Sequence, residues 1–163
     1  MPLIVHWPGA IKPGSTNSVP VITCDLYPTL LAMTGVADAP GHQPDGVNLV
    51  PLLKQTGVLE RDALYWHYPH YQLYQQGGTT PYGAIRAGDF KLIEFFDGNR
   101  IELYNLAEDV GEAHDLALRR AEQATALRTR LHAWRKSVGA QLPTVNTAYD
   151  PTKPEHIPAV KKK

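Results

Sequence analysis

The stretch YGAIRAGDFKLIEFFDGNRIELYN, residues 82–105, decides the fold of this 163-residue chain. It contains three short runs rich in aliphatic and aromatic residues, at 82–87, 90–96 and 100–104, and such runs are typical of β-strands. The runs are separated by Ala87-Gly88-Asp89 and Asp97-Gly98-Asn99, whose residue types form the tight turns of β-hairpins. The stretch therefore predicts three strands that run up and down as an antiparallel meander.

A further strand and a helix complete this unit. Residues 63–68, ALYWHY, form an aromatic run that ends before Pro69, which predicts a strand. After the meander, apolar residues recur at three- and four-residue steps until Gly139, the pattern of an amphipathic helix and its end. Most charged residues of that segment lie off the apolar stripe, so we expect the stripe to cover one face of the sheet. The stripe consists of Ala124, Leu127, Leu131, Trp134 and Val138.

The region before residue 60 is less regular. Leu3-Ile4-Val5 is a continuous apolar run near prolines, the pattern of a strand buried on both faces of a parallel sheet. Because such a strand needs neighbours and none precedes it, we expect its sheet to lie outside these residues. A short helix is predicted from Asp25, as N-cap, to Gly35. Its apolar face, which we expect to pack against a core, contains Leu26, Leu30 and Met33.

Composition argues against several kinds of partner. Lys and Arg number 16, as do Asp and Glu, so the formal net charge is zero. The chain therefore lacks the basic excess that binds nucleic acid or an anionic membrane surface. No apolar run is long enough to cross a bilayer. Cys24 is the single cysteine, which excludes a disulfide within the chain.

A series of blocks, in the same order along the chain, resembles the C-terminal third of a type I sulfatase. The likeness is to heparan N-sulfatase-like and arylsulfatase members of the alkaline-phosphatase-like superfamily. Each block alone is only a strand or turn signature, and their common order carries the resemblance. The blocks are PLIVHWPG (2–9), DLYPTLL (25–31), DGVNLVPLL (45–53), ALYWHYPHY (63–71), GAIR (83–86), GDFKLI (88–93) and ELYNL (102–106).

This resemblance implies an α/β parent fold, represented here by an α+β piece. Residues 1–60 would retain one strand and one helix of the large α/β domain. Residues 61–140 would be the C-terminal subdomain, a four-stranded antiparallel sheet packed by a C-terminal helix. Residues 141–163 would be an extended tail, and its last lysines a solvated terminus.

Sulfatases of this kind convert a cysteine or serine in a C/S-x-P/A-x-R motif to formylglycine, and hold calcium with acidic side chains. Residues 24–28, CDLYP, have leucine where the motif needs proline or alanine, and proline where it needs arginine. The aspartates are scattered among turns without the dense spacing of a calcium site. We therefore expect no catalytic residue, metal or cofactor in these residues. Calcium and formylglycine are expected only in a preceding part of the protein, and the 163 residues alone are predicted to be inactive.

Four residues are candidates for lining a substrate pocket: His67, His70, Tyr71 and Arg86. The first three lie in WHYPHY, residues 66–71, where aromatic stems with polar tips suit a sugar or an aryl group. Strand alternation offers a simpler alternative, in which one set of these side chains is core and the other is surface. A zinc site at the two histidines is a weaker hypothesis, because Pro69 interrupts them and no third ligand is evident.

The other candidate positions also have two interpretations. Arg86 suits an anion, but an arginine near Asp89 and Glu94 is more often a surface ion-pair partner. Residues 72–81 are polar and rich in glycine, which fits either a variable rim of a cleft or a plain hairpin connection.

Two functions remain open. The main hypothesis is the C-terminal part of a sulfatase that hydrolyses sulfate esters or sulfamates, with a sulfated carbohydrate or aryl sulfate as substrate. The piece itself would be structural and would line the pocket. The alternative is a non-enzymatic glycan-binding or interaction module. The opening strand favours the sulfatase, because a self-standing module has no reason to keep a doubly buried strand without its sheet. By resemblance, the parent protein is expected to be periplasmic or secreted.

Overall fold

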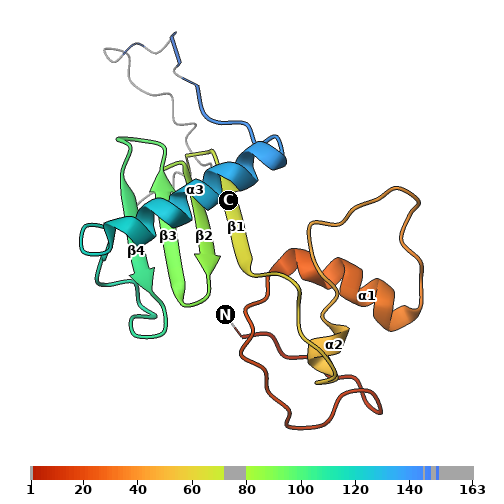
Figure 1. The fold of residues 1–163 in the computed structure, drawn as a ribbon. Coiled ribbons are helices and arrows are strands. Elements are labelled where there is room, and N and C mark those ends of the chain that lie inside the picture. Colours follow the sequence, from red (N-terminus) through yellow and green to blue (C-terminus); the bar gives the residue numbers. More distant parts are fainter. Residues whose placement is uncertain (1, 72–79, 145, 148–149, 151–163) are drawn as a thin grey trace, which may run out of the picture.

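The second part of the chain forms an antiparallel sheet. The computed structural model describes residues 2–71, 80–144, 146–147 and 150. Four strands pair in sequence order, each antiparallel to the next, as Figure 1 shows. They are β1 (Ala63–Tyr68), β2 (Tyr82–Ala87), β3 (Phe90–Phe95) and β4 (Ile101–Asn105). The predicted meander is confirmed, and the last two strands differ from the predicted bounds by a single residue at their ends.

The register sorts the side chains between the two faces of the sheet. Tyr65 lies opposite Ile85, and Ile85 lies opposite Leu92, which in turn lies opposite Leu103. The helix α3 (Ala121–Ser137) crosses this face (Figure 1), which we call the helix face. The opposite side, the far face, carries the alternate residues of each strand. The core lies between sheet and helix, and its buried residues are Ala63, Ile85, Leu92, Leu103, Ala117, Ala124, Leu127 and Leu131.

The predicted stripe of α3 is confirmed as part of this core. Leu131 is fully buried, and the ring of Trp134 stacks on Tyr65 with 4.8 Å between ring centroids. The helix ends at Ser137, and Gly139 follows with φ +64°, a left-handed conformation that glycine adopts without strain. Val138, at the end of the predicted stripe, is half exposed and contributes little to the core.

The first part of the chain is organised around Asp25, whose side chain is fully buried. A short 3-10 turn η1 (Thr23–Asp25) precedes the helix α1 (Leu26–Thr34), and α2 (Val50–Leu53) packs beside α1. The Asp25 carboxylate accepts backbone N–H groups of Ile22 and Val47, at 2.9 and 3.0 Å. Arg61, immediately before β1, donates two further hydrogen bonds at 2.6 and 2.9 Å. Asp25 thus ties the first region to the start of the sheet.

Thr29 and Gly46 fix the loop that follows α1. The Thr29 hydroxyl donates to the Asp25 carbonyl at 2.6 Å and accepts the Leu49 N–H at 2.9 Å. Gly46 passes so close to η1 that a Cβ there would lie 2.1 Å from the carbonyl oxygen of Cys24, which excludes any side chain. These contacts give the DLYPT and DGVNL blocks a structural role.

Two sequence predictions for this region depend on partners outside the described chain and stay predictions. Leu3-Ile4-Val5 forms no strand here, and Ile4 is 90% exposed, because no described segment pairs with it and a strand exists only through its partner. On α1, Leu26 and Leu30 are exposed, so the described chain supplies no core for that face, and the buried residue is Thr29. Asp25 is the N-cap residue as predicted, but its carboxylate binds Arg61 and other backbone groups rather than capping α1.

The proposed division at residues 60 and 140 stays a prediction. In Figure 1 the first region lies beside the end of the sheet at which β1 begins. Among the described residues, no helix combines the length and the hydropathy that crossing a bilayer would require. Most of the predicted tail, from residue 151 onward, lies outside the described residues.

Candidate functional site

Aromatic residues with polar tips gather at the end of the sheet where β1 ends and β2 begins. The ring of His70 meets the edge of Tyr68, with 5.6 Å between centroids, and Tyr68 lies 5.8 Å from Tyr82. The Tyr71 hydroxyl donates to Asp97, in the turn between β3 and β4, at 2.7 Å. His70 and Tyr71 are both exposed. We call Tyr68, His70, Tyr71 and Tyr82 the aromatic end.

The aromatic end can offer stacking surfaces and hydrogen bonds to a sugar or aryl group. Tyrosine and histidine combine an apolar ring with a donor or acceptor at its tip. Residues 72–79, the predicted rim, follow directly after Tyr71 but lie outside the described residues. The structure therefore brings together two of the four candidate residues, His70 and Tyr71.

His67 is not part of this group, because it lies on the helix face. Its Nε2 lies 2.8 Å from the backbone carbonyl oxygen of Gln141, just after α3. A carbonyl can only accept, so Nε2 carries the proton and donates. The Nδ1 atom is buried without a partner, and the ring lies 5.5 Å from Phe96. These contacts hold the chain that leaves α3 against the sheet.

Arg86 lies on the far face, towards the opposite end of the sheet. It pairs in register with Leu64 and Lys91, one residue before the end of β2. Neither Asp89 nor Glu94 binds it, so the predicted surface ion pair is wrong: Glu94 belongs to the other face. Arg86 lines a cleft of about 790 Å³ between the far face and the first region, together with Leu64 and Trp66.

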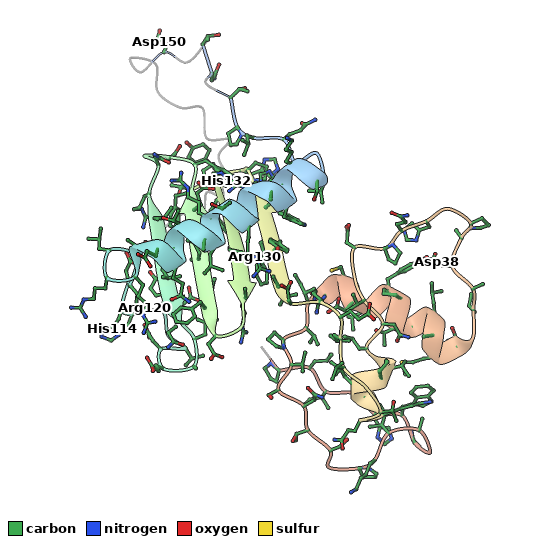
Figure 2. The ribbon with its side chains drawn as sticks, viewed as in Figure 1. Asp38, His114, Arg120, Arg130, His132 and Asp150 are labelled. Carbon is green, nitrogen blue, oxygen red and sulfur yellow. The ribbon has the colours of Figure 1, made fainter. Side chains whose placement is uncertain are left out.

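A buried charge cluster on the helix face was not among the sequence predictions. Glu94 is 4% exposed and binds two arginines and one histidine of α3. Arg128 Nε donates to it at 2.6 Å, His132 Nε2 lies 2.9 Å from both carboxylate oxygens, and Arg135 Nη2 donates as well. Figure 2 shows His132 on the helix above the sheet.

The environment of Glu94 favours its charged form. Burial alone would raise the pKa of Glu94, but hydrogen bonds from Arg135, His132 and Arg128 outweigh it and lower the pKa below its ordinary value. Two signals in the sequence point to this cluster. Glu94 comes two residues after the core residue Leu92, so both side chains point to the same face of the strand. Arg128, His132 and Arg135 follow the i, i+4, i+7 spacing of one helix face.

The described residues do not fit the cofactors that the resemblance implies. No group of three or more His, Cys, Asp or Glu side chains that could hold a metal ion occurs among them. Cys24 is exposed on η1, and partial burial together with the nearby Asp25 charge raises the pKa of its thiol. At neutral pH it is therefore not the thiolate that a nucleophile requires.

Comparison with known proteins identifies the family. The family model described as N-sulphoglucosamine sulphohydrolase, C-terminal, matches residues 1–137. The chain belongs to this sulfatase family. An N-acetylglucosamine-6-O-sulfatase of Bacteroides thetaiotaomicron is 36% identical over 120 residues, covering 71% of this chain and 21% of the relative. A sulfatase of Formosa agariphila is 31% identical over 150 residues, covering 82% and 26%.

The fold agrees with that of solved relatives of this sulfatase domain. One is a protein in complex with its substrate D-glucosamine-2-N,6-O-disulfate, which matches with a TM-score of 0.69 and 30% identity over 82% of this chain and 28% of that one. The resemblance seen in the sequence blocks is confirmed, as is the expected sheet with its C-terminal helix. The chain spans about a quarter of the length of these relatives.

Proposed function

We propose that this sulfatase domain is the C-terminal part of an enzyme that hydrolyses sulfate esters or sulfamates of sulfated sugars. The observation that carries the proposal is the family match over residues 1–137. The name of the relative from Bacteroides thetaiotaomicron, an N-acetylglucosamine-6-O-sulfatase, favours an amino sugar over a simple aryl sulfate. Export of the whole protein to the periplasm or the medium stays a prediction from the resemblance.

Within that enzyme, the domain would be structural and would supply one wall of the substrate pocket. The aromatic end supports this role, because His70 and Tyr71 are exposed and carry polar tips on apolar rings. Loops at the ends of sheets are favoured binding positions. His67 and Arg86 are left out of the wall, since one binds Gln141 on the helix face and the other lies towards the far end of β2.

The test compares the purified 163-residue chain with the full-length product of its gene. We expect glucosamine 6-sulfate to be hydrolysed by the full-length protein and not by the chain alone. His70→Ala in the full-length protein should raise KM roughly tenfold with little change in kcat, as for a contact equally strong in ground and transition states. His114→Ala, an exposed histidine in the link before α3, is the matched control and should leave both constants unchanged.

Two results would contradict the proposal. Turnover by the chain alone that survives chelation and Cys24→Ala would require a different mechanism. A full-length product that binds sulfated sugars without hydrolysing them would instead identify a glycan-binding module.

A further inference from the structure

The second half of α3 concentrates positive charge. Over the whole chain, Lys and Arg are as numerous as Asp and Glu, but residues 123–149 contain four basic residues and no Asp or Glu. A helix C-terminus favours cations in its last turn, which accounts for Arg135 and Lys136. It does not account for Arg128 and Arg130, which lie two turns earlier, with His132 between the two pairs.

These side chains lie on two sides of α3. Arg128, His132 and Lys136 follow one another at four-residue steps, which places them along one side of the helix. Arg130 binds Asp62, next to the start of β1, and Figure 2 shows it on the opposite side of the helix from His132. We call Arg128, His132 and Lys136 the basic flank.

The described chain does not balance the charge of the basic flank. Glu94 binds Arg128 and His132, but the buried Arg135 already matches its single negative charge. Lys136 is exposed, and none of the ion pairs among the described residues includes it. The side chains of Arg128 and His132 are 33% and 50% exposed, so an external ligand can reach them. The basic flank is therefore an accessible surface with excess positive charge.

We propose that the basic flank is an exosite for a sulfated polysaccharide, which holds the polymer on α3 while one of its sugars is in the active site of the whole enzyme. Arginine, lysine and histidine all donate hydrogen bonds, and such bonds are strong when the acceptor is an anionic oxygen. Eight residues of helix rise about 12 Å, so the flank offers a row of anion contacts to an extended chain. The choice of a sulfated sugar polymer rests on the proposed function.

A nucleic acid fits the basic flank less well. Sites for single-stranded nucleic acid combine basic residues with aromatic rings on which bases stack. The exposed neighbours along this side of α3 are Thr125 and Thr129, whose small hydroxyl side chains suit sugar hydroxyls rather than bases. The one aromatic ring of α3, that of Trp134, is stacked on Tyr65 against the sheet.

The first experiment measures binding by the full-length product of the gene. It is titrated with heparin, a sulfated polysaccharide, and with hyaluronan, an unsulfated one. We expect heparin to bind more tightly, and added salt to weaken its binding. Lys136→Gln, which breaks no ion pair of the described chain, should weaken heparin binding roughly threefold, the effect of one exposed charge contact. The double variant with Arg128→Gln should weaken it roughly tenfold.

Two matched variants separate a charged flank from a general loss of charge or of stability. Arg130→Gln removes an arginine from the opposite side of the same helix and should leave the affinity for heparin unchanged. Arg128→Lys keeps the charge of the flank and should retain most of the affinity. Urea unfolding of each variant checks that it is folded under the binding conditions.

The second experiment measures turnover. Lys136→Gln should raise KM for a heparin oligosaccharide and leave both constants for glucosamine 6-sulfate unchanged, because the monosaccharide does not reach the flank. A full-length protein that hydrolyses neither substrate, but still loses heparin binding on Lys136→Gln, would contradict the proposed function and support the binding surface on α3.

Other outcomes would overturn the proposal. Equal affinity for heparin and hyaluronan would mean that sulfate is not recognised. An unchanged affinity in the double variant, or an equal loss in Arg130→Gln, would mean that the basic flank is not the binding surface. Tighter binding of single-stranded DNA than of heparin would assign the flank to a nucleic acid.

Discussion

The two faces of the sheet differ in whether their charged side chains have ion-pair partners within the described chain. On the helix face, Glu94 is buried and receives hydrogen bonds from two arginines and one histidine of α3. On the far face, Arg86 has a buried Nε and no partner among the described residues. Glu94 and Arg135 thus form a buried ion pair within the chain, although His67 Nδ1 and Arg135 Nε on the same face are buried without a hydrogen-bond partner, as Arg86 Nε is on the far face. The faces should therefore respond differently to substitution.

The largest effect is expected in the core of the helix face. Leu131→Ala removes a fully buried side chain and should lower the free energy of unfolding by roughly 4 kcal/mol, within the range of about 2–5 kcal/mol for such truncations. Urea unfolding followed by circular dichroism measures the change. Leu118→Ala, at a side chain 96% exposed, is the control and should have almost no effect. Similar losses for the two variants would mean that α3 does not pack on the sheet.

The next effect concerns the charge of Glu94. Glu94→Gln leaves Arg135 buried without a counter-charge and should cost roughly 3 kcal/mol, the low end for breaking a buried ion pair. The expected loss of stability is at the low end of this range because the side chains of Arg128 and His132 remain partly exposed to water. Glu108→Gln, at an exposed glutamate, serves as the control in the same urea titration. A loss below about 0.5 kcal/mol would show that the cluster is not energetically coupled to folding.

A smaller effect is expected from pH. The pKa of Glu94 is lower in the folded protein than its ordinary value of 4.5, and the pKa of Asp25 is lower than 3.8. A lowered folded pKa gives stability that is present above the ordinary value and is lost as the pH falls through the folded value. The urea midpoint should therefore fall on acidification below about pH 5, and less steeply in Glu94→Gln. Parallel slopes for both proteins would contradict the assignment.

The smallest effect is expected on the far face. Arg86→Gln breaks no hydrogen bond or ion pair of the described chain, so the free energy of unfolding should change by less than about 0.5 kcal/mol. The same urea titration measures it, with Arg119→Gln alongside. A large loss would reveal a partner for Arg86 within the chain.

The sequence was sufficient for the local features of the fold and insufficient for the long-range ones. Turn residues such as Gly88 and Asn99 define the hairpins, and the apolar stripe of α3 follows from its periodicity. Glu94 was missed because its partners lie 34 to 41 residues away, on an element whose charged residues the periodicity assigns to solvent. The strand at Leu3 stays a prediction for a related reason, since strands depend on a partner that a local pattern does not contain.

The candidate site was predicted in part. The aromatic motif of residues 66–71 located His70 and Tyr71 together, because both follow the end of one strand. The motif gave no indication that His67 binds Gln141, 74 residues later. The predicted strand at 82–87 contained Arg86, but only the packing of the first region against the sheet shows that its Nε is buried.

The most direct test of the contrast between the faces is the difference in free energy of unfolding between Glu94→Gln and Arg86→Gln, measured in one urea series at neutral pH. We expect Glu94→Gln to be less stable than Arg86→Gln by roughly 3 kcal/mol, because only the first substitution abandons a buried partner. Equal stability of the two variants, or a greater loss for Arg86→Gln, would contradict the claim that the helix face holds a buried ion pair coupled to folding and the far face does not.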